Sequence, residues 1–266
     1  MAGRRQRPLT SARILPMLVT LAPLACGVAL GHDAWVVSQA EAVKRALDYT
    51  GLGVQPHVTV SAEATTVPAD DDVPFLRLAG KPAWRVTLDN VTLAVRGRTG
   101  KVHENPTIRR LDVWLDRADG RLLKIVSPHP VGVDPPTSPS SASLEGRLEG
   151  MGQRFEGVPA EMPRINFMQG LQSITEGIGG TSMAKQVEAI YVLLRHTISE
   201  DTPYMPCRKA PCPRWIITLR YLPPTPFPGP PAPGGGRTTV YRRPFENYEH
   251  EVDPTTGKWL GATTAP

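Results

Sequence analysis

The chain has 266 residues, of which 40% are hydrophobic, an ordinary share for a globular protein with one large or two small cores. Its 24 glycines and 29 prolines indicate that much of the length is turn, loop or linker. The formal charge of +5 comes mainly from four arginines in residues 1–31, and the rest of the chain has 26 basic and 25 acidic side chains. Because no basic stripe remains, the composition argues against nucleic-acid binding.

Residues 1–31 have the three parts of a secretory signal peptide. An arginine-rich start is followed by an uncharged run over 14–30 and by the small-residue exit Ala29-Leu30-Gly31. We therefore predict cleavage after Gly31 and export to the periplasm or the extracellular space. Two alternatives remain, an uncleaved anchor and a lipid on Cys26, and only these would bring the protein to a membrane.

Cleavage after Gly31 would make His32 the first residue of the mature chain. An α-amine and an imidazole on one residue can chelate copper, so a periplasmic copper-binding protein is one alternative function. A second histidine would have to complete the site, and the candidates are His57, His103, His129, His196 and His250. An N-terminal histidine without a ligand role is the simpler interpretation, and we predict no cofactor.

The segment 32–127 is predicted to be a first domain with one helix and an antiparallel sheet. Ser38 and Glu41 have the spacing of a capping box, which predicts a helix that begins there and ends at Gly51. Apolar and polar residues then alternate in four predicted strands, at 84–88, 91–95, 111–115 and 122–126.

The segment 128–160 is rich in Pro, Ser and Gly and is predicted to be an interdomain linker. A second domain is predicted over 161–262. It comprises a helix over 183–198, a strand over 215–221, a Pro-rich loop over 222–237 and a hairpin over 248–260. The order of helix and tryptophan-led strand repeats that of the first domain.

Cys207 and Cys212 are the cysteines outside the predicted leader. An even number of cysteines in an exported chain indicates a disulfide. Half of a zinc site is the competing interpretation, but zinc needs two further ligands at short spacing.

Two segments, 113–123 and 250–260, resemble the strand, Asp-x-x-x-Gly turn and strand that end a PepSY domain, and Pro82-Ala-Trp-Arg-Val86 resembles the strand before them. PepSY domains are small exported modules associated with protease propeptides and with inhibition. The resemblance implies tandem divergent copies. We therefore expect an α+β protein made of two units, each with one helix packed on a small antiparallel sheet.

No signature of a nucleophilic serine, a phosphate loop, a dinucleotide site or a zinc protease occurs in the chain, so we predict a protein that is not an enzyme. Trp114 alternates with Asp112 and Asp116, which makes it the candidate surface contact. The predicted function is a binding or protease-modulating component of the cell envelope, with another exported or envelope protein as partner. A structural role in the envelope is a further alternative.

Overall fold

The computed structural model describes most of the chain from Val36 onward. The described ranges are 36–53, 55–68, 78–97, 100–129, 152–178, 184–196, 207, 210–220, 222, 226–231, 237–241 and 247–265. Within them, one antiparallel sheet holds nine strands: β1 (Thr59–Thr66), β2 (Pro82–Asp89), β5 (Arg110–Asp116), β6 (Leu122–Val126), β7 (Gln153–Gly157), β8 (Gln186–His196), β9 (Cys212–Arg220), β12 (Asn247–Val252) and β13 (Trp259–Ala265).

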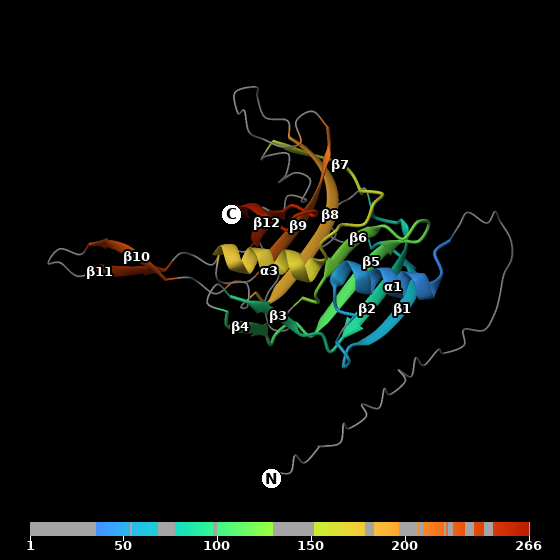
Figure 1. Ribbon diagram of the computed structural model, residues 1–266, viewed down its shortest axis with the longest axis horizontal. Helices are drawn as coiled ribbons and strands as arrows, with labels where there is room; N and C mark the ends of the chain where they lie inside the picture. The colour runs from blue at the N-terminus through green and yellow to red at the C-terminus, as the bar shows by residue number, and fades with distance from the viewer. Residues whose placement is uncertain are drawn as a thin grey trace, which may run out of the picture. The chain divides into compact units, whose positions relative to one another are not determined.

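The strand order across the sheet is β1-β2-β5-β6-β8-β9-β12-β13 (Figure 1). Strands β6 and β7 pair with successive stretches of β8 on the edge opposite β9. Two hairpins form separate small sheets: β3 (Leu93–Arg96) with β4 (Val102–Asn105), and β10 (Pro226–Pro231) with β11 (Arg237–Tyr241).

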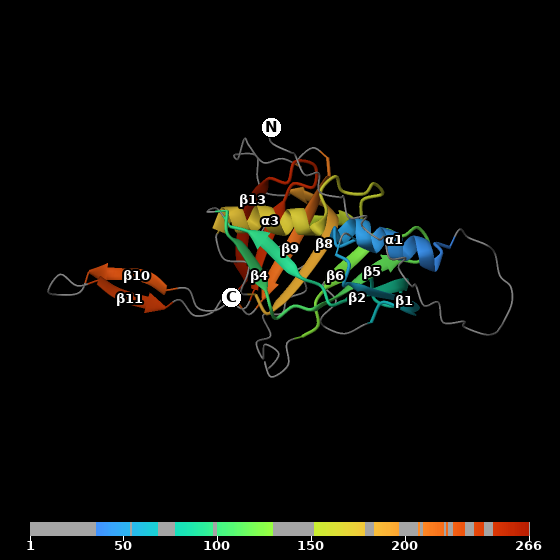
Figure 2. The ribbon, with the colours of Figure 1, turned by 60° about the horizontal axis from the view of Figure 1, so that its bottom comes forward.

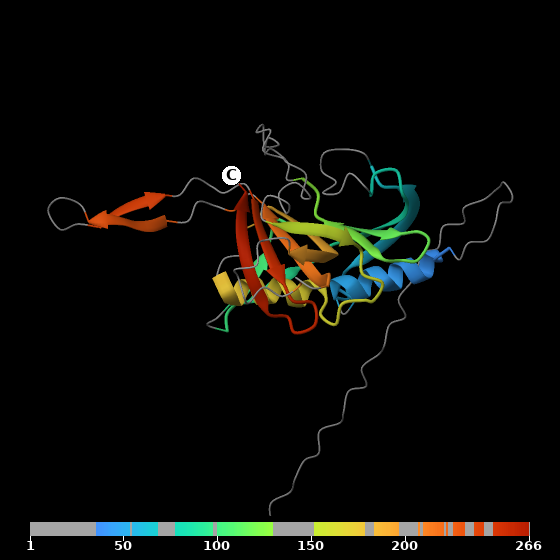
Figure 3. The same ribbon diagram turned by 90° about the horizontal axis from the view of Figure 1, so that it is seen from above.

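Two helices lie on the same face of the sheet (Figure 3). Helix α1 (Gln39–Thr50) begins as predicted, because the Ser38 hydroxyl accepts a hydrogen bond from the Glu41 amide at 3.2 Å. Helix α3 (Phe167–Ile178) has a full capping box. Asn166 and Gln169 each accept the other's backbone amide through their side chains, at 2.9 and 2.8 Å.

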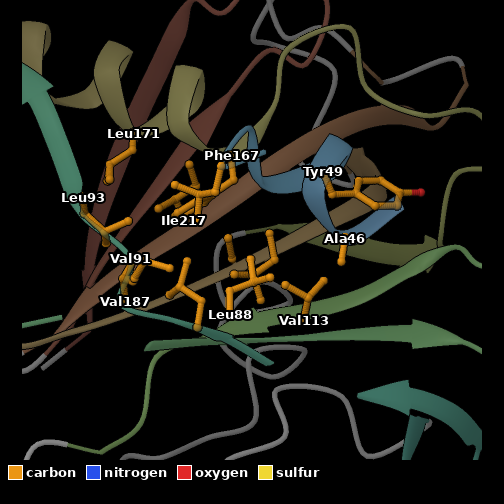
Figure 4. Packing of buried hydrophobic residues seen from close by; sticks show 14 of the residues in the cluster. Ala46, Tyr49, Leu88, Val91, Leu93, Val113, Phe167, Leu171, Val187 and Ile217 are labelled. Carbon is orange, nitrogen blue, oxygen red and sulfur yellow. The ribbon is translucent and has the colours of Figure 1, made fainter. Parts of the chain in front are cut away.

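One hydrophobic cluster fills the space between the two helices and the sheet (Figure 4). Ala46 and Tyr49 of α1 and Phe167 of α3 belong to it, together with inward-facing residues of strands from both halves of the chain. We call this side of the sheet the helix face and the opposite side the distal face. A smaller cluster on the distal face contains no helix residue.

The predicted fold class of two helix-on-small-sheet units is wrong. Strand β6 of the first half pairs with β8 of the second, through Ile125 with Ala189 and Val126 with Glu188, so that both halves share one sheet. This pairing also removes two unpaired strand edges from the middle of the molecule.

The helix predicted over 183–198 is also wrong, because Gln186–His196 is strand β8. Val187, Ala189 and Tyr191 belong to the helix-face cluster, while Ile190, Val192 and Leu194 belong to the distal one. A strand buried on both faces has no alternation of apolar and polar residues, and its apolar run then fits the spacing of a helix by chance.

Other predicted segments also differ from the structure. The predicted linker 128–160 lies partly outside the described residues, and its end contains β7. The predicted loop 222–237 contains β10, which pairs with β11. Strand β1 was not predicted. The predicted leader, 1–31, lies outside the described residues.

The two halves contribute the same series of elements to the shared sheet (Figure 2). A helix is followed by four antiparallel strands, with a hairpin inserted between the second and third, as α1-β1-β2-(β3-β4)-β5-β6 and as α3-β8-β9-(β10-β11)-β12-β13. The registers agree residue for residue: Thr59 pairs with Asp89 and Asp89 with Arg110, while Gln186 pairs with Arg220 and Arg220 with Asn247.

Trp84 and Trp215 attach the two helix starts to the sheet in the same way. The indole Nε1 of Trp84 donates to the carbonyl oxygen of Val37 at 2.8 Å, and that of Trp215 to the carbonyl oxygen of Ile165 at 3.1 Å. Val37 and Ile165 each precede the capping residue of a helix. The position of each helix is thus set from the second strand of its own half.

The turns after β5 and β12 are also equivalent. The amide of Gly120 donates to the carbonyl of Asp116 at 2.8 Å, and the amide of Gly257 to the carbonyl of Asp253 at 2.9 Å. Both glycines are left-handed, with φ of 71° and 74°. These are the Asp-x-x-x-Gly turns on which the resemblance to PepSY domains rests.

Candidate binding surface on the distal face

A row of three side chains crosses the first strands of the distal face. Glu63 of β1 lies opposite Arg85 of β2, which lies opposite Trp114 of β5. The Arg85 guanidinium donates to Glu63 at 3.3 Å and to Asp112 at 2.8 Å, and its central carbon lies 5.6 Å from the centroid of the Trp114 ring. We call Glu63, Arg85, Asp112 and Trp114, with Arg110, the Arg85–Trp114 patch.

The charges of this patch are held in place by several partners. Asp112 also accepts from the hydroxyl of Thr87 at 2.8 Å and from Arg110 at 3.3 Å. The hydrogen bond to Asp112 raises the pKa of Arg85 above its ordinary value, against the opposing effect of burial. The guanidinium is therefore a fixed positive charge beside an aromatic ring.

Three charged side chains of the Arg85–Trp114 patch are more exposed than the charged side chains in the middle of the distal face. Glu63 of β1, Arg85 of β2 and Arg110 of β5 are 63%, 31% and 42% exposed. Glu188 of β8 is only 5% exposed and is paired with Arg220 at 3.0 Å. Solvent and partner molecules can therefore reach the Arg85–Trp114 patch, whereas the ion pair of Glu188 with Arg220 is buried within the fold.

The predicted disulfide is present between Cys207 and Cys212. Arg214 ties it to the sheet: its Nη2 donates to the Cys207 sulfur at 3.1 Å, and its Nε donates to Glu251 at 2.8 Å. Gln153 of β7 donates to the same carboxylate at 3.2 Å. The disulfide thus belongs to a partly buried polar network at the start of β9.

The predicted copper chelate depends on His32, which lies outside the described residues, so it stays a prediction. Within the described ranges, no group of three or more His, Cys, Asp or Glu residues is close enough to hold a metal ion. Of the candidate second ligands, His250 is fully buried on the helix face.

Trp114 is half-buried and packs beside the distal cluster, so it combines packing with a partly exposed edge. Sequence reasoning missed Arg85, whose guanidinium lies beside the Trp114 ring. Both residues alternate with apolar residues on predicted strands, but the pairing of these two strands and their register could not be known from the sequence. No helix in the described part of the chain is long and apolar enough to span a membrane.

Comparison of the chain with protein-family models, with curated proteins and with solved structures found no match.

Proposed function

We propose that this protein is an exported, non-catalytic binding module of the cell envelope, and that it recognises another exported or envelope protein through the Arg85–Trp114 patch. The observation that carries the proposal is an arginine held between two carboxylates and a tryptophan ring on the accessible part of the distal face. Arginine and tryptophan are enriched among residues that dominate protein interfaces.

Rigidity supports the same function. Arg85 is held by Glu63 and Asp112, so little side-chain freedom remains to be lost when a partner binds. Trp114 offers a flat apolar surface beside that charge, which suits a partner segment with an acidic and an apolar side chain. The resemblance of the two Asp-x-x-x-Gly hairpins to PepSY domains favours a regulatory partner such as a protease.

Site-specific photo-crosslinking tests the proposal. A photoreactive phenylalanine analogue at position 114 should form an adduct with a distinct protein in cells that produce the chain. The same analogue at Met162, an exposed apolar residue before α3, is the control and should not form that adduct. The partner is then purified, and its Kd is measured by titration.

Trp114→Ala should weaken binding of that purified partner by about tenfold or more. Arg85→Lys keeps the positive charge but removes the planar guanidinium with its several N–H donors, and should also weaken binding. Met162→Ala should leave the Kd unchanged. If no adduct forms at position 114, or if both patch variants keep wild-type affinity while folded by circular dichroism, the proposal is wrong. If the partner is a protease, the chain should change its activity in proportion to occupancy.

A further inference from the structure

The two halves of the chain are joined by strand pairing between the last strand of the first half and the first strand of the second. Strand β6, the last of the first half, pairs with β8, the first strand of the second, through Ile125 with Ala189. The amide of Ser127 continues the junction by donating to the carbonyl of Val187 at 2.9 Å, and the Val187 amide donates back to the Ser127 hydroxyl at 2.9 Å.

The equivalents of these two strands are the two edges of the sheet. Strand β13 corresponds to β6, and strand β1 corresponds to β8. Within the described residues, β13 pairs only with β12, and β1 only with β2. In the described part of the chain, both sides of the internal junction are therefore repeated at opposite edges of one sheet without a strand partner. On the β1 edge, the carbonyl oxygen of Ala62 accepts a hydrogen bond from the Gln39 side chain at 2.8 Å, which an incoming strand would replace.

Neither edge strand contains a lysine or a proline. Strand β13 contains no charged residue and no proline, and β1 contains one charge, Glu63, and no proline. Natural edge strands are commonly blocked by lysine, proline or a covering loop. The threonines of both edges and Val60 of β1 are β-branched and suit a strand conformation.

Two equivalent leucines differ in exposure, because one lies at the internal junction and the other at a sheet edge. Leu123 bulges from β6 between the residues paired with Trp114 and Leu115, and Leu260 bulges from β13 between those paired with Glu251 and Val252. Leu123 is 3% exposed and belongs to the distal cluster, in which residues of β8 are its neighbours. Leu260 is 38% exposed.

The inserted hairpins also contribute to the contact between the two halves. Hairpin β3–β4 of the first half lies on α3 of the second, where the backbone of Arg96 exchanges two hydrogen bonds of 2.6 Å with the Gln172 side chain. Leu171 and Thr175 of α3 are buried there. Their equivalents on α1, counted from the helix caps, are Val43 and Leu47, which are only half-buried.

We propose that the protein associates head to tail, with the β13 edge of one copy pairing with the β1 edge of a second copy in the register of the internal junction. Ala262 then lies opposite Ala62 of the second copy, as Ile125 lies opposite Ala189. Leu260 becomes covered at the new junction, and hairpin β10–β11 lies against α1 of the second copy. Such an interface is not self-complementary, so it builds a ring or an open chain and does not stop at a symmetric dimer.

Disulfide trapping tests the register. In a Cys26→Ser background, chains with Ala262→Cys and chains with Ala62→Cys are mixed under mild oxidation. The expected product is a disulfide between the two different variants. Glu63→Cys, one residue along β1, is the matched control, because its side chain points to the opposite face of the sheet and should crosslink poorly with position 262.

Analytical ultracentrifugation tests the association itself. The wild-type chain should form a concentration-dependent series that extends beyond two copies, and Leu260→Asp should raise the dissociation constant by about tenfold or more. Met162→Asp places the same charge at another exposed apolar residue and should leave assembly unchanged. A monomer at all concentrations, a dimer trapped through position 262 of both chains, or assembly unaffected by Leu260→Asp would overturn the proposal. Of the Arg85–Trp114 patch, Glu63 lies on the β1 edge, whereas Arg85 lies on β2 and Trp114 on β5. Variants of Arg85 and Trp114 therefore test the proposed function and Leu260→Asp tests the assembly, so failure of either idea leaves the other standing.

Discussion

His250 occupies in β12 the position that Val113 occupies in β5. Val113 pairs with Val86 of β2, and His250 pairs with Ile217 of β9, at equivalent places in the two halves. His250 is fully buried, its ring stacks on Tyr248 at 5.9 Å between centroids, and neither ring nitrogen has a hydrogen-bond partner in the described part of the chain. An ionisable group thus stands where the other half has an aliphatic one.

This histidine should make stability depend on pH. Burial lowers the pKa of His250 from 6.5 to about 4. Between these values the unfolded chain binds a proton that the folded chain does not, so the free energy of unfolding is highest above pH 6.5 and falls as the pH drops toward 4. The full effect is about 3 kcal/mol.

His250→Val should remove this component. Urea unfolding at pH 7 and pH 5 should show that the wild-type chain loses about 2 kcal/mol more than the variant between the two conditions. His57 is exposed, and His57→Gln should keep the wild-type difference. Equal pH slopes for the wild type and His250→Val would show that the buried imidazole is not responsible.

The two tryptophans that attach the helices should differ in their contribution. Trp215→Phe removes the bond to Ile165 and leaves a cavity in a fully buried site, so we expect a loss of about 2 to 3 kcal/mol. Trp84→Phe removes the same kind of bond from a half-buried site, and should cost about 1 kcal/mol. Chemical denaturation measures both, and a larger loss at Trp84 contradicts this reasoning.

The two turn glycines provide a matched pair for backbone strain. Each is left-handed, so alanine should cost about 1 kcal/mol at either position. At Gly120 the added methyl group would also lie 2.7 Å from the guanidinium of Arg45, whereas at Gly257 the nearest atom is 3.5 Å away. Gly120→Ala should therefore destabilise the protein more than Gly257→Ala, as judged by their urea midpoints.

The disulfide should contribute modestly to stability, because it closes a short loop. Replacing both Cys207 and Cys212 by serine should lower the free energy of unfolding by about 2 kcal/mol. Adding a reductant to the wild-type chain should have the same effect, and Cys26→Ser should have none. A reductant that leaves the unfolding midpoint of the wild type unchanged would show that the bond is absent in solution.

Local patterns in the sequence were sufficient for several elements. The cap at Ser38 set the start of α1, alternation located β2, β5 and β6, and the Asp-x-x-x-Gly spacing located both hairpin turns. These features depend on hydrogen bonds and side-chain periods within a few residues, so they are readable without the rest of the chain.

The sequence by itself therefore determined the first helix, the strands β2, β5 and β6 and the disulfide pair, whereas the predicted strand over 91–95 pairs with β4 outside the main sheet. Only the tertiary structure decided that Gln186–His196 is a strand, because a segment covered on both faces loses its period. The single sheet, the meeting of Arg85 with Trp114 and the burial of His250 likewise depend on strand register and on contacts between distant segments. Register over such separations is set by the packing of the whole core, which no local pattern in the chain contains.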